Sequence, residues 1–163
     1  MLDSGCIAKA LRSRTWRSIS AEKVLDDLLL RRLHKAMFGD VWRWAGEYRL
    51  SEKDIGCHPR HISVKVRDLC ADAAHCFADT RLSTDEAVCK FHRDLVAIHP
   101  FANGNGRHAR AAADILMGSL GVQPFTCGRV NLVTPSQTRN QYIAALQAAD
   151  AGDDSPLVAF ARS

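Results

Sequence analysis

The chain has 163 residues, of which 47% are hydrophobic and 25% charged, as in a soluble globular protein of one domain. Its formal net charge of +4 suits an anionic ligand but not the dense basic stripe of a nucleic-acid-binding protein, so we expect no direct nucleic-acid contact. The N-terminus lacks a secretory pattern and no apolar run is long enough to cross a bilayer, which indicates a cytoplasmic protein without a membrane partner.

The first third of the chain predicts helices followed by a hairpin. Leucines and a methionine recur at helical spacing over 21–38, where Ser20 is the candidate cap and Gly39 ends the helix. A short second helix is predicted over 41–45. Residues 47–57 lack the helical period and predict a small β-hairpin.

The rest of the chain predicts a series of helices. Apolar stripes with helical period cover 61–78, 84–98, 109–120 and 135–149, and a last short helix follows Pro156. Few segments alternate with a period of two residues, so a large sheet is not expected. The predicted fold class is all-α with one small β-hairpin.

The cysteines give no sign of a metal centre. Six are scattered without paired ligand spacing. Cys70, Cys76 and Cys89 lie among apolar residues in helical patterns and are predicted to be buried thiols in a reducing compartment.

The most informative stretch is His99-Pro-Phe-Ala-Asn-Gly-Asn-Gly-Arg-His-Ala-Arg110, which an apolar run follows. This order predicts a loop that leads into a helix N-terminus, where free N–H groups and the helix dipole favour a phosphate. Gly104 and Gly106 allow the backbone to approach a ligand, and Arg107 and Arg110 add permanent positive charge on one helix face. His99 is a candidate general base beside the phosphate.

Each feature of this stretch also has an ordinary explanation. A histidine before proline can end a helix, the glycines can serve a turn and the arginines can be solvated. Their coincidence within residues 99–110 favours the functional interpretation.

The string closely resembles the signature of Fic-domain proteins: His, any, Phe, any, Asp/Glu/Asn, Gly-Asn-Gly-Arg, any two, Arg. Residues 42–56 resemble the family's flap and the segment leading into it, and 142–157 resemble its closing helix and tail, so the likeness spans about 33 to 160. Residues 38–46 are most similar to a bacterial branch named mobile mystery protein B.

The resemblance implies a protein adenylyltransferase that moves AMP from ATP to a hydroxyl of a target protein. His99 would be the base, Arg107 would hold the β-phosphate and Arg110 the γ-phosphate. Main-chain amides would form the anion hole. The nucleotide-binding residues implied are Gly104, Asn105, Gly106, Arg107 and Arg110.

The other residues of the string have smaller implied roles. Asn103 stands where active relatives often carry a carboxylate for Mg²⁺, so it is expected to be a weak ligand while phosphates and water hold the metal. Weaker metal affinity, a different nucleotide and low activity all remain open. Phe101 is expected to anchor the loop in the core, His108 to face solvent and His92 to be structural.

The predicted hairpin over 47–57 resembles the family's flap, which would clamp a target by adding a strand to it. An ordinary surface hairpin is the alternative. The target-binding residues implied are Arg49, Lys53, Asp54, Ile55 and Gly56.

We expect one domain over 1–163, with 1–19 as an N-terminal extension and 99–110 as the active-site loop and helix start. The family's inhibitory pattern is not complete: Ser18 and Glu22 have the spacing, but Lys23 breaks the last position. Inhibition is therefore expected to come from a separate partner, as in a toxin–antitoxin pair, or to have been lost by truncation. The alternatives are a transferase with another nucleotide donor or a phosphotransferase, and a weakly active nucleotide-binding regulator.

Overall fold

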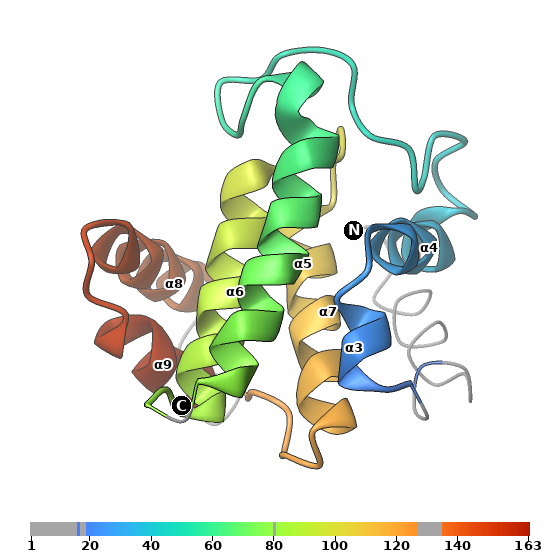
Figure 1. Cartoon of the computed structure of the whole chain (residues 1–163). Coiled ribbons are helices and arrows are strands. Elements are labelled where there is room, and N and C mark those ends of the chain that lie inside the picture. Colours follow the sequence, from blue (N-terminus) through green and yellow to red (C-terminus); the bar gives the residue numbers. More distant parts are fainter. Residues whose placement is uncertain (1–15, 17–18, 80, 127–134) are drawn as a thin grey trace.

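The computed structural model describes residues 16, 19–79, 81–126 and 135–163. This described part contains seven α-helices and one 3₁₀ turn, and it contains no β-strand (Figure 1). The helical part of the predicted fold class is therefore confirmed for the described residues, but the class as predicted included a hairpin. Cys6, Cys127 and most of the predicted N-terminal extension lie outside the described residues.

The predicted hairpin is wrong. Residues 47–57, here named the crossing segment, form an irregular loop. A hairpin needs its two arms to bond to each other, but the backbone N–H groups of Arg49 and Cys57 donate to the carbonyls of Pro100 and Ile98. The arms are thus attached to another part of the chain.

The predicted first helix is two helices, α3 (Ala21–Val24) and α4 (Asp27–Phe38). The break has a local cause, since Asp26 has extended backbone angles and its carboxylate accepts from Leu29 N–H at the start of α4. The helix predicted over 41–45 is a series of turns, so that prediction is wrong.

The centre of the molecule is a set of three long helices, α5 (Ile62–Ala78), α6 (Thr84–Ile98) and α7 (Asn105–Ser119), which the 3₁₀ turn η1 (Pro59–His61) precedes. Each runs opposite to its neighbour, so the end of α6 and the start of α7 meet at one end of the molecule (Figure 1). Ser83 and Glu86 form a reciprocal capping box that begins α6.

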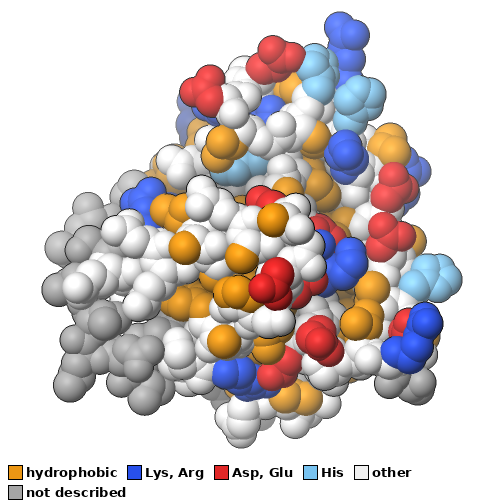
Figure 2. Space-filling model, turned by 90° about the vertical axis from the view of Figure 1, so that its left-hand side faces the viewer, with side chains coloured by type: hydrophobic (Ala, Val, Ile, Leu, Met, Phe, Trp, Pro, Cys, Tyr) orange, Lys and Arg blue, Asp and Glu red, His pale blue; other side chains and the backbone are white. Residues whose placement is uncertain are grey.

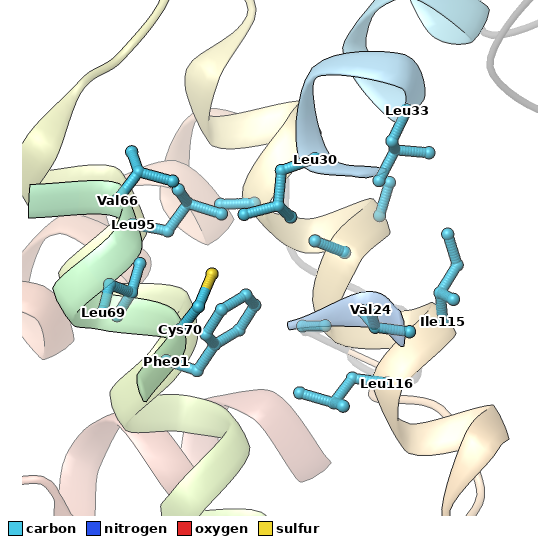
Figure 3. Close-up of a cluster of buried hydrophobic side chains, with 14 of the residues drawn as sticks. Val24, Leu30, Leu33, Val66, Leu69, Cys70, Phe91, Leu95, Ile115 and Leu116 are labelled. Atoms are coloured by element: carbon cyan, nitrogen blue, oxygen red, sulfur yellow. The ribbon is translucent and has the colours of Figure 1, made fainter. Parts of the chain in front are cut away.

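Between these helices and α4 lies the main core, shown in Figure 3. Phe91 and Leu95 of α6 face Leu30 of α4 and Leu116 of α7, and all four side chains are buried. Because burial of such a side chain stabilises a fold by roughly 1.5–3 kcal/mol, this cluster holds α6 and α7 in register. Cys70 and Cys89 are buried as predicted, while Cys76 is half-buried.

Two further helices, α8 (Pro135–Asp150) and α9 (Ser155–Arg162), pack against each other and against α6. A smaller cluster of apolar side chains, centred on Leu157 and Phe160, fills this junction. None of the described helices combines the length and the apolar character that a transmembrane span requires.

Candidate functional site

The site begins where α6 ends. His99 follows the last helical residue with φ of 53° and ψ of 59°, a left-handed conformation that is uncommon without glycine. The next residue is Pro100, which disfavours a helical conformation at the residue before it. The sequence therefore turns the chain sharply at the predicted base.

The N-terminus of α7 forms the opposite wall. Gly104 precedes the helix with φ of 82°, and no side chain caps it. A Cβ at Gly104 would lie 2.8 Å from the Phe38 ring and 3.2 Å from the Trp42 ring, so glycine is required by packing as well as by backbone angle. The first N–H groups of a helix have no intrahelical acceptor, and this end therefore has positive potential.

A pocket of about 620 Å³ lies between these walls. The structure brings the predicted base and the whole predicted anion loop together around it, and both arginines line it. The lining residues are His92, His99, Ala102, Asn103, Gly104, Asn105, Gly106, Arg107, Arg110, Arg139, Tyr142 and Ile143.

Gly106 differs from Gly104 in what surrounds it. A Cβ built on Gly106 would meet no protein atom within 4 Å, and its backbone angles are helical. Neither packing nor backbone conformation of the protein requires glycine at this position. The space that the missing side chain leaves belongs to the pocket.

The loop is braced from within by Asn105. Its side-chain oxygen accepts from the Phe101 N–H at 2.9 Å and its side-chain nitrogen donates to the Phe101 carbonyl at 2.8 Å. Asn105 is buried, and both ends of its amide are used in the loop. Its role in the structure is loop support. Phe101 is buried as predicted.

A second brace, which the sequence analysis missed, is His34 of α4. Its ring stacks on Phe101 at 3.8 Å, Nδ1 accepts from Gly46 N–H at 3.0 Å and Nε2 donates to the Asn103 carbonyl at 3.1 Å. Burial lowers the pKa of His34 to about 4 and keeps the ring neutral. Its place between Leu30 and Phe38, one turn from each on a buried helix face, is the sequence signal that could have indicated it.

Asn103 gives little support for a metal ion. Its side-chain oxygen accepts from the Gly104 N–H at 2.7 Å, which turns it toward the loop's own backbone. No group of three or more His, Cys, Asp or Glu side chains suited to a metal occurs in the described ranges. The residues present do not form a magnesium site by themselves.

The surroundings of His99 favour its neutral form. Burial lowers the pKa of His99 below its ordinary value, Arg49 and Lys53 lower it further by charge repulsion, and a hydrogen bond to the Val96 backbone opposes them. A ring that donates one N–H to a carbonyl keeps a lone pair on its other nitrogen. Neutral, oriented imidazole is the state that can accept a proton.

The crossing segment lies beside His99 and extends into solvent. Leu50 is 93% exposed and Ile55 61% exposed, whereas Arg49 is 4% exposed. Figure 2 views the face formed by α8 and α9, and charged and histidine side chains gather at its upper end, over the crossing segment and η1. Of the residues predicted to contact a target, Ile55 thus lies at the surface and Arg49 beneath it.

Four pocket residues come from α6 and α8. His92 lies near Tyr142, whose hydroxyl is 3.4 Å from His92 Nε2, and Arg139 and Ile143 complete this wall. Burial and the neighbouring Arg110 lower the pKa of His92 to about 4. The sequence analysis predicted helix α8 and a structural role for His92, but no pocket role for Arg139, Tyr142 or Ile143, because the weak amphipathic pattern of α8 does not show which face meets the pocket.

His108 corrects another prediction. It was expected to face solvent, but it is 0% exposed and its Nε2 donates to the Leu30 carbonyl at 2.8 Å. The ring also lies edge-on to Phe101. It belongs to the packing behind the loop.

Two curated relatives show how far the likeness extends along the sequence. The chain is 28% identical over 141 residues to protein adenylyltransferase fic-1 of Caenorhabditis elegans, covering 83% of this chain and 26% of the relative. It is 39% identical over 143 residues to protein adenylyltransferase Fic of Drosophila grimshawi, covering 85% and 28%. The chain therefore spans about a quarter of the length of these relatives.

The fold is also similar to that of BepC, a VirB-translocated effector protein of Bartonella tribocorum whose crystal structure contains AMPPNP. The TM-score is 0.71 at 18% identity, and the match covers 96% of this chain and 81% of that one. A model described as the Fic/DOC family matches residues 24–117, which include α5, α6, most of α7 and the whole loop from His99 to Arg110. The chain belongs to the Fic/DOC family.

Proposed function

We propose that this chain is a protein adenylyltransferase, which transfers AMP from ATP to a hydroxyl of a target protein. The curated relatives that it matches are named for this activity. The observation that carries the proposal is the pocket in which a half-buried histidine of lowered pKa faces an uncapped helix N-terminus and two arginines. We further propose that residues 1–163 act as a single domain.

The triphosphate would lie at the start of α7. Main-chain N–H groups of Asn105 and Gly106 would donate to it, with Arg107 near the β-phosphate and Arg110 near the γ-phosphate. The open space at Gly106 supports this placement, because a ligand there explains a glycine that the protein's own packing does not. Asn105 would act by holding the loop in shape.

The chemistry would be an in-line substitution at the α-phosphorus. His99 accepts the proton of the target hydroxyl while the new oxygen–phosphorus bond forms. The bond from the α-phosphorus to the bridging oxygen breaks, and pyrophosphate leaves with its electron pair. Helix N–H groups and arginines stabilise the added negative charge. Mg²⁺ would neutralise phosphate charge when bound, held mainly by phosphate oxygens and water, with Asn103 as a weak ligand.

The target would dock on the crossing segment. Ile55, together with Lys53 and Asp54, is exposed next to His99 and could contact a target chain, whereas Arg49 and Gly56 would hold the segment in place. A separate inhibitory partner, a toxin role and a cytoplasmic location remain predictions of the sequence.

Labelling with ATP tests the proposal directly. The purified chain is incubated with Mg²⁺ and a dialysed cell extract, with the label on either the α- or the γ-phosphate. We expect protein to acquire the α-label and not the γ-label, with a mass increase of one AMP. His99→Ala should abolish labelling, while His75→Ala, an exposed histidine of α5, should not. Transfer of the γ-label by the chain, or of no label, would refute the proposal.

The two glycines of α7 offer a matched test of nucleotide binding. Gly106 and Gly118 both have helical angles and no protein atom near a built Cβ, so Gly→Ala should slightly stabilise either helix position. Gly106→Ala should weaken ATP binding at least tenfold, because its methyl group enters the phosphate space. Gly118→Ala should bind ATP as the wild type does in calorimetric titration. Equal affinities for both variants would place the phosphates elsewhere.

A further inference from the structure

The turn that carries His99 is bonded to the crossing segment at three successive backbone carbonyls. Cys57 N–H donates to the Ile98 carbonyl at 3.2 Å. Arg49 supplies the other two bonds, from Nε to the His99 carbonyl at 2.7 Å and from its backbone N–H to the Pro100 carbonyl at 3.0 Å. Arg49 alone thus bonds to the carbonyls of both His99 and Pro100.

The guanidinium of Arg49 connects the turn to both ends of the crossing segment. Besides the His99 carbonyl, it donates from Nη1 to the Ser51 carbonyl at 2.9 Å and from Nη2 to the Cys57 carbonyl. The side chain is 4% exposed, and a buried guanidinium is tolerated only when its donors are satisfied. A planar, branched group can donate in these separate directions at once, which a lysine ammonium on a flexible stem cannot reproduce.

Gly56 closes the contact from the other side. Its φ is +94°, and a Cβ there would lie 2.5 Å from the His99 Cβ and 2.8 Å from Arg49 Nη2. The backbone of Gly56 therefore lies directly against the His99 side chain. Any larger residue would have to displace either the histidine or the guanidinium.

We propose that Arg49 is a positioning residue for His99, and that with Gly56 it forms a clamp which fixes the imidazole at the pocket wall. This inference rests on the proposed function, in which His99 is the base. A left-handed non-glycine residue is strained and persists only where its surroundings hold it. The three carbonyl contacts supply that restraint, so the clamp acts on the orientation of the base and not on the phosphates.

The charge of Arg49 also acts on the histidine. The charged or titratable groups around His99 are Arg49 and Lys53 of the crossing segment and, on the pocket walls, His92, Arg107, Arg110 and Arg139. After burial, Arg49 is the largest influence that lowers the pKa of His99. Position and charge can be separated experimentally, because lysine keeps the charge but not the three-way contact.

Two substitutions of Arg49 make this separation. Arg49→Gln removes the charge and the side-chain contacts, and Arg49→Lys removes the side-chain contacts alone. For each we measure ATP affinity by calorimetry, the AMP-transfer rate, and the pKa of the His99 ring by NMR titration of the unliganded protein. Arg60→Gln, which removes an exposed cation of η1, is the charge-matched control.

We expect both variants to bind ATP within about twofold of the wild type and to transfer AMP roughly ten- to a hundredfold more slowly, as for a displaced base. The pKa of His99 should rise in Arg49→Gln and return toward the wild-type value in Arg49→Lys. The control should match the wild type in all three measurements.

Glycine substitutions test the clamp without changing charge. Gly56→Ala and Gly152→Ala impose similar backbone strain, since their φ values are +94° and +99°, but only Gly56 has neighbours that a Cβ would meet. Gly56→Ala should slow transfer with ATP affinity retained. Gly152→Ala should leave both unchanged.

The outcomes are decisive in either direction. Full transfer in Arg49→Lys would show that charge alone suffices, and full transfer in Arg49→Gln would remove any role in positioning. Either result overturns the clamp, as does a parallel loss of ATP affinity and transfer. If circular dichroism shows both Arg49 variants unfolded, Arg49 serves only the fold and the proposal fails. If the wild type transfers no nucleotide, the proposed function fails, while an unchanged His99 pKa in Arg49→Gln would count separately against the clamp.

Discussion

At the scale of single residues, the environment of His99 determines the pH at which the site can work. Burial and the positive charges of Arg49 and Lys53 lower its pKa, and the base must be neutral to accept a proton. The rate of transfer should therefore fall only when the pH drops below the ordinary histidine pKa of about 6.5. Activity is retained on the alkaline side of this fall.

A profile of kcat/KM against pH checks this, since it reports the ionisation of the free enzyme. The midpoint of the acid limb should lie below about 6.5 in the wild type. A midpoint at or above that value would mean that another group controls the rate or that the imidazole is better solvated than its burial implies.

The residues that sequence reasoning located are those whose role depends on local order. His99, Gly104 and Arg110 stand at fixed spacing around a helix start, and that spacing is sufficient to bring them to one pocket. His34 and Arg49 act through contacts with residues 69 and 50 positions away. No local pattern specifies such partners, so their roles required the structure.

At the scale of elements, the capping box of α6 helps to hold His99, because this helix ends at the site. Ser83 accepts from the Glu86 N–H at 3.2 Å, and Glu86 accepts from the Ser83 N–H at 2.8 Å. Ser83→Ala should reduce the free energy of unfolding by about 1 kcal/mol. ATP affinity should not change, since the cap lies at the far end of the helix from the pocket.

Ser20 provides the matched control in chemical denaturation. It also precedes a helix with extended backbone angles, but its side chain makes no capping bond. Ser20→Ala should cost only a few tenths of a kcal/mol. If both serines cost the same, the hydrogen bonds of the box contribute nothing beyond backbone preference.

Helices were predicted correctly where apolar residues recur with a helical period. The prediction failed for the crossing segment, where contacts with distant residues determine the backbone path. The helices α5, α6 and α8 begin and end within about two residues of their predicted bounds, which is the usual margin of boundary definition. The crossing segment has no period of its own, and its shape is set by Arg49 and by bonds to the 98–100 turn. The hairpin was predicted from the absence of a helical period and from the resemblance to the family's flap, and neither specifies these contacts.

At the scale of the whole molecule, buried histidines link stability to pH. Burial lowers the pKa of His92 to about 4 and that of His108 to about 3. The unfolded chain binds protons at these residues from about pH 6.5 downward, while the folded chain does not. The stability that these neutral histidines contribute is fully present above about pH 6.5. It is lost as the pH decreases toward their pKa values in the folded chain.

Each such histidine should lower the free energy of unfolding by about 1.4 kcal/mol per pH unit between pH 6.5 and pH 4. Urea unfolding at several pH values measures this slope. His108→Gln should reduce this slope by about 1.4 kcal/mol per pH unit, which corresponds to one proton fewer bound on unfolding. Above about pH 7 the slope should not change. An unchanged slope would show that His108 gains a proton without unfolding.

The antiparallel arrangement of α6 and α7 orients an electric field across the pocket. The carbonyl end of α6 lies beside the imidazole and the amide end of α7 lies beside the phosphate position, so the field in the gap between them runs from the amide end to the carbonyl end. Along this axis an imidazolium is stabilised at one side and an oxyanion at the other. The scaffold thus favours the separation of charge that accompanies proton removal and bond formation, before any charged side chain contributes.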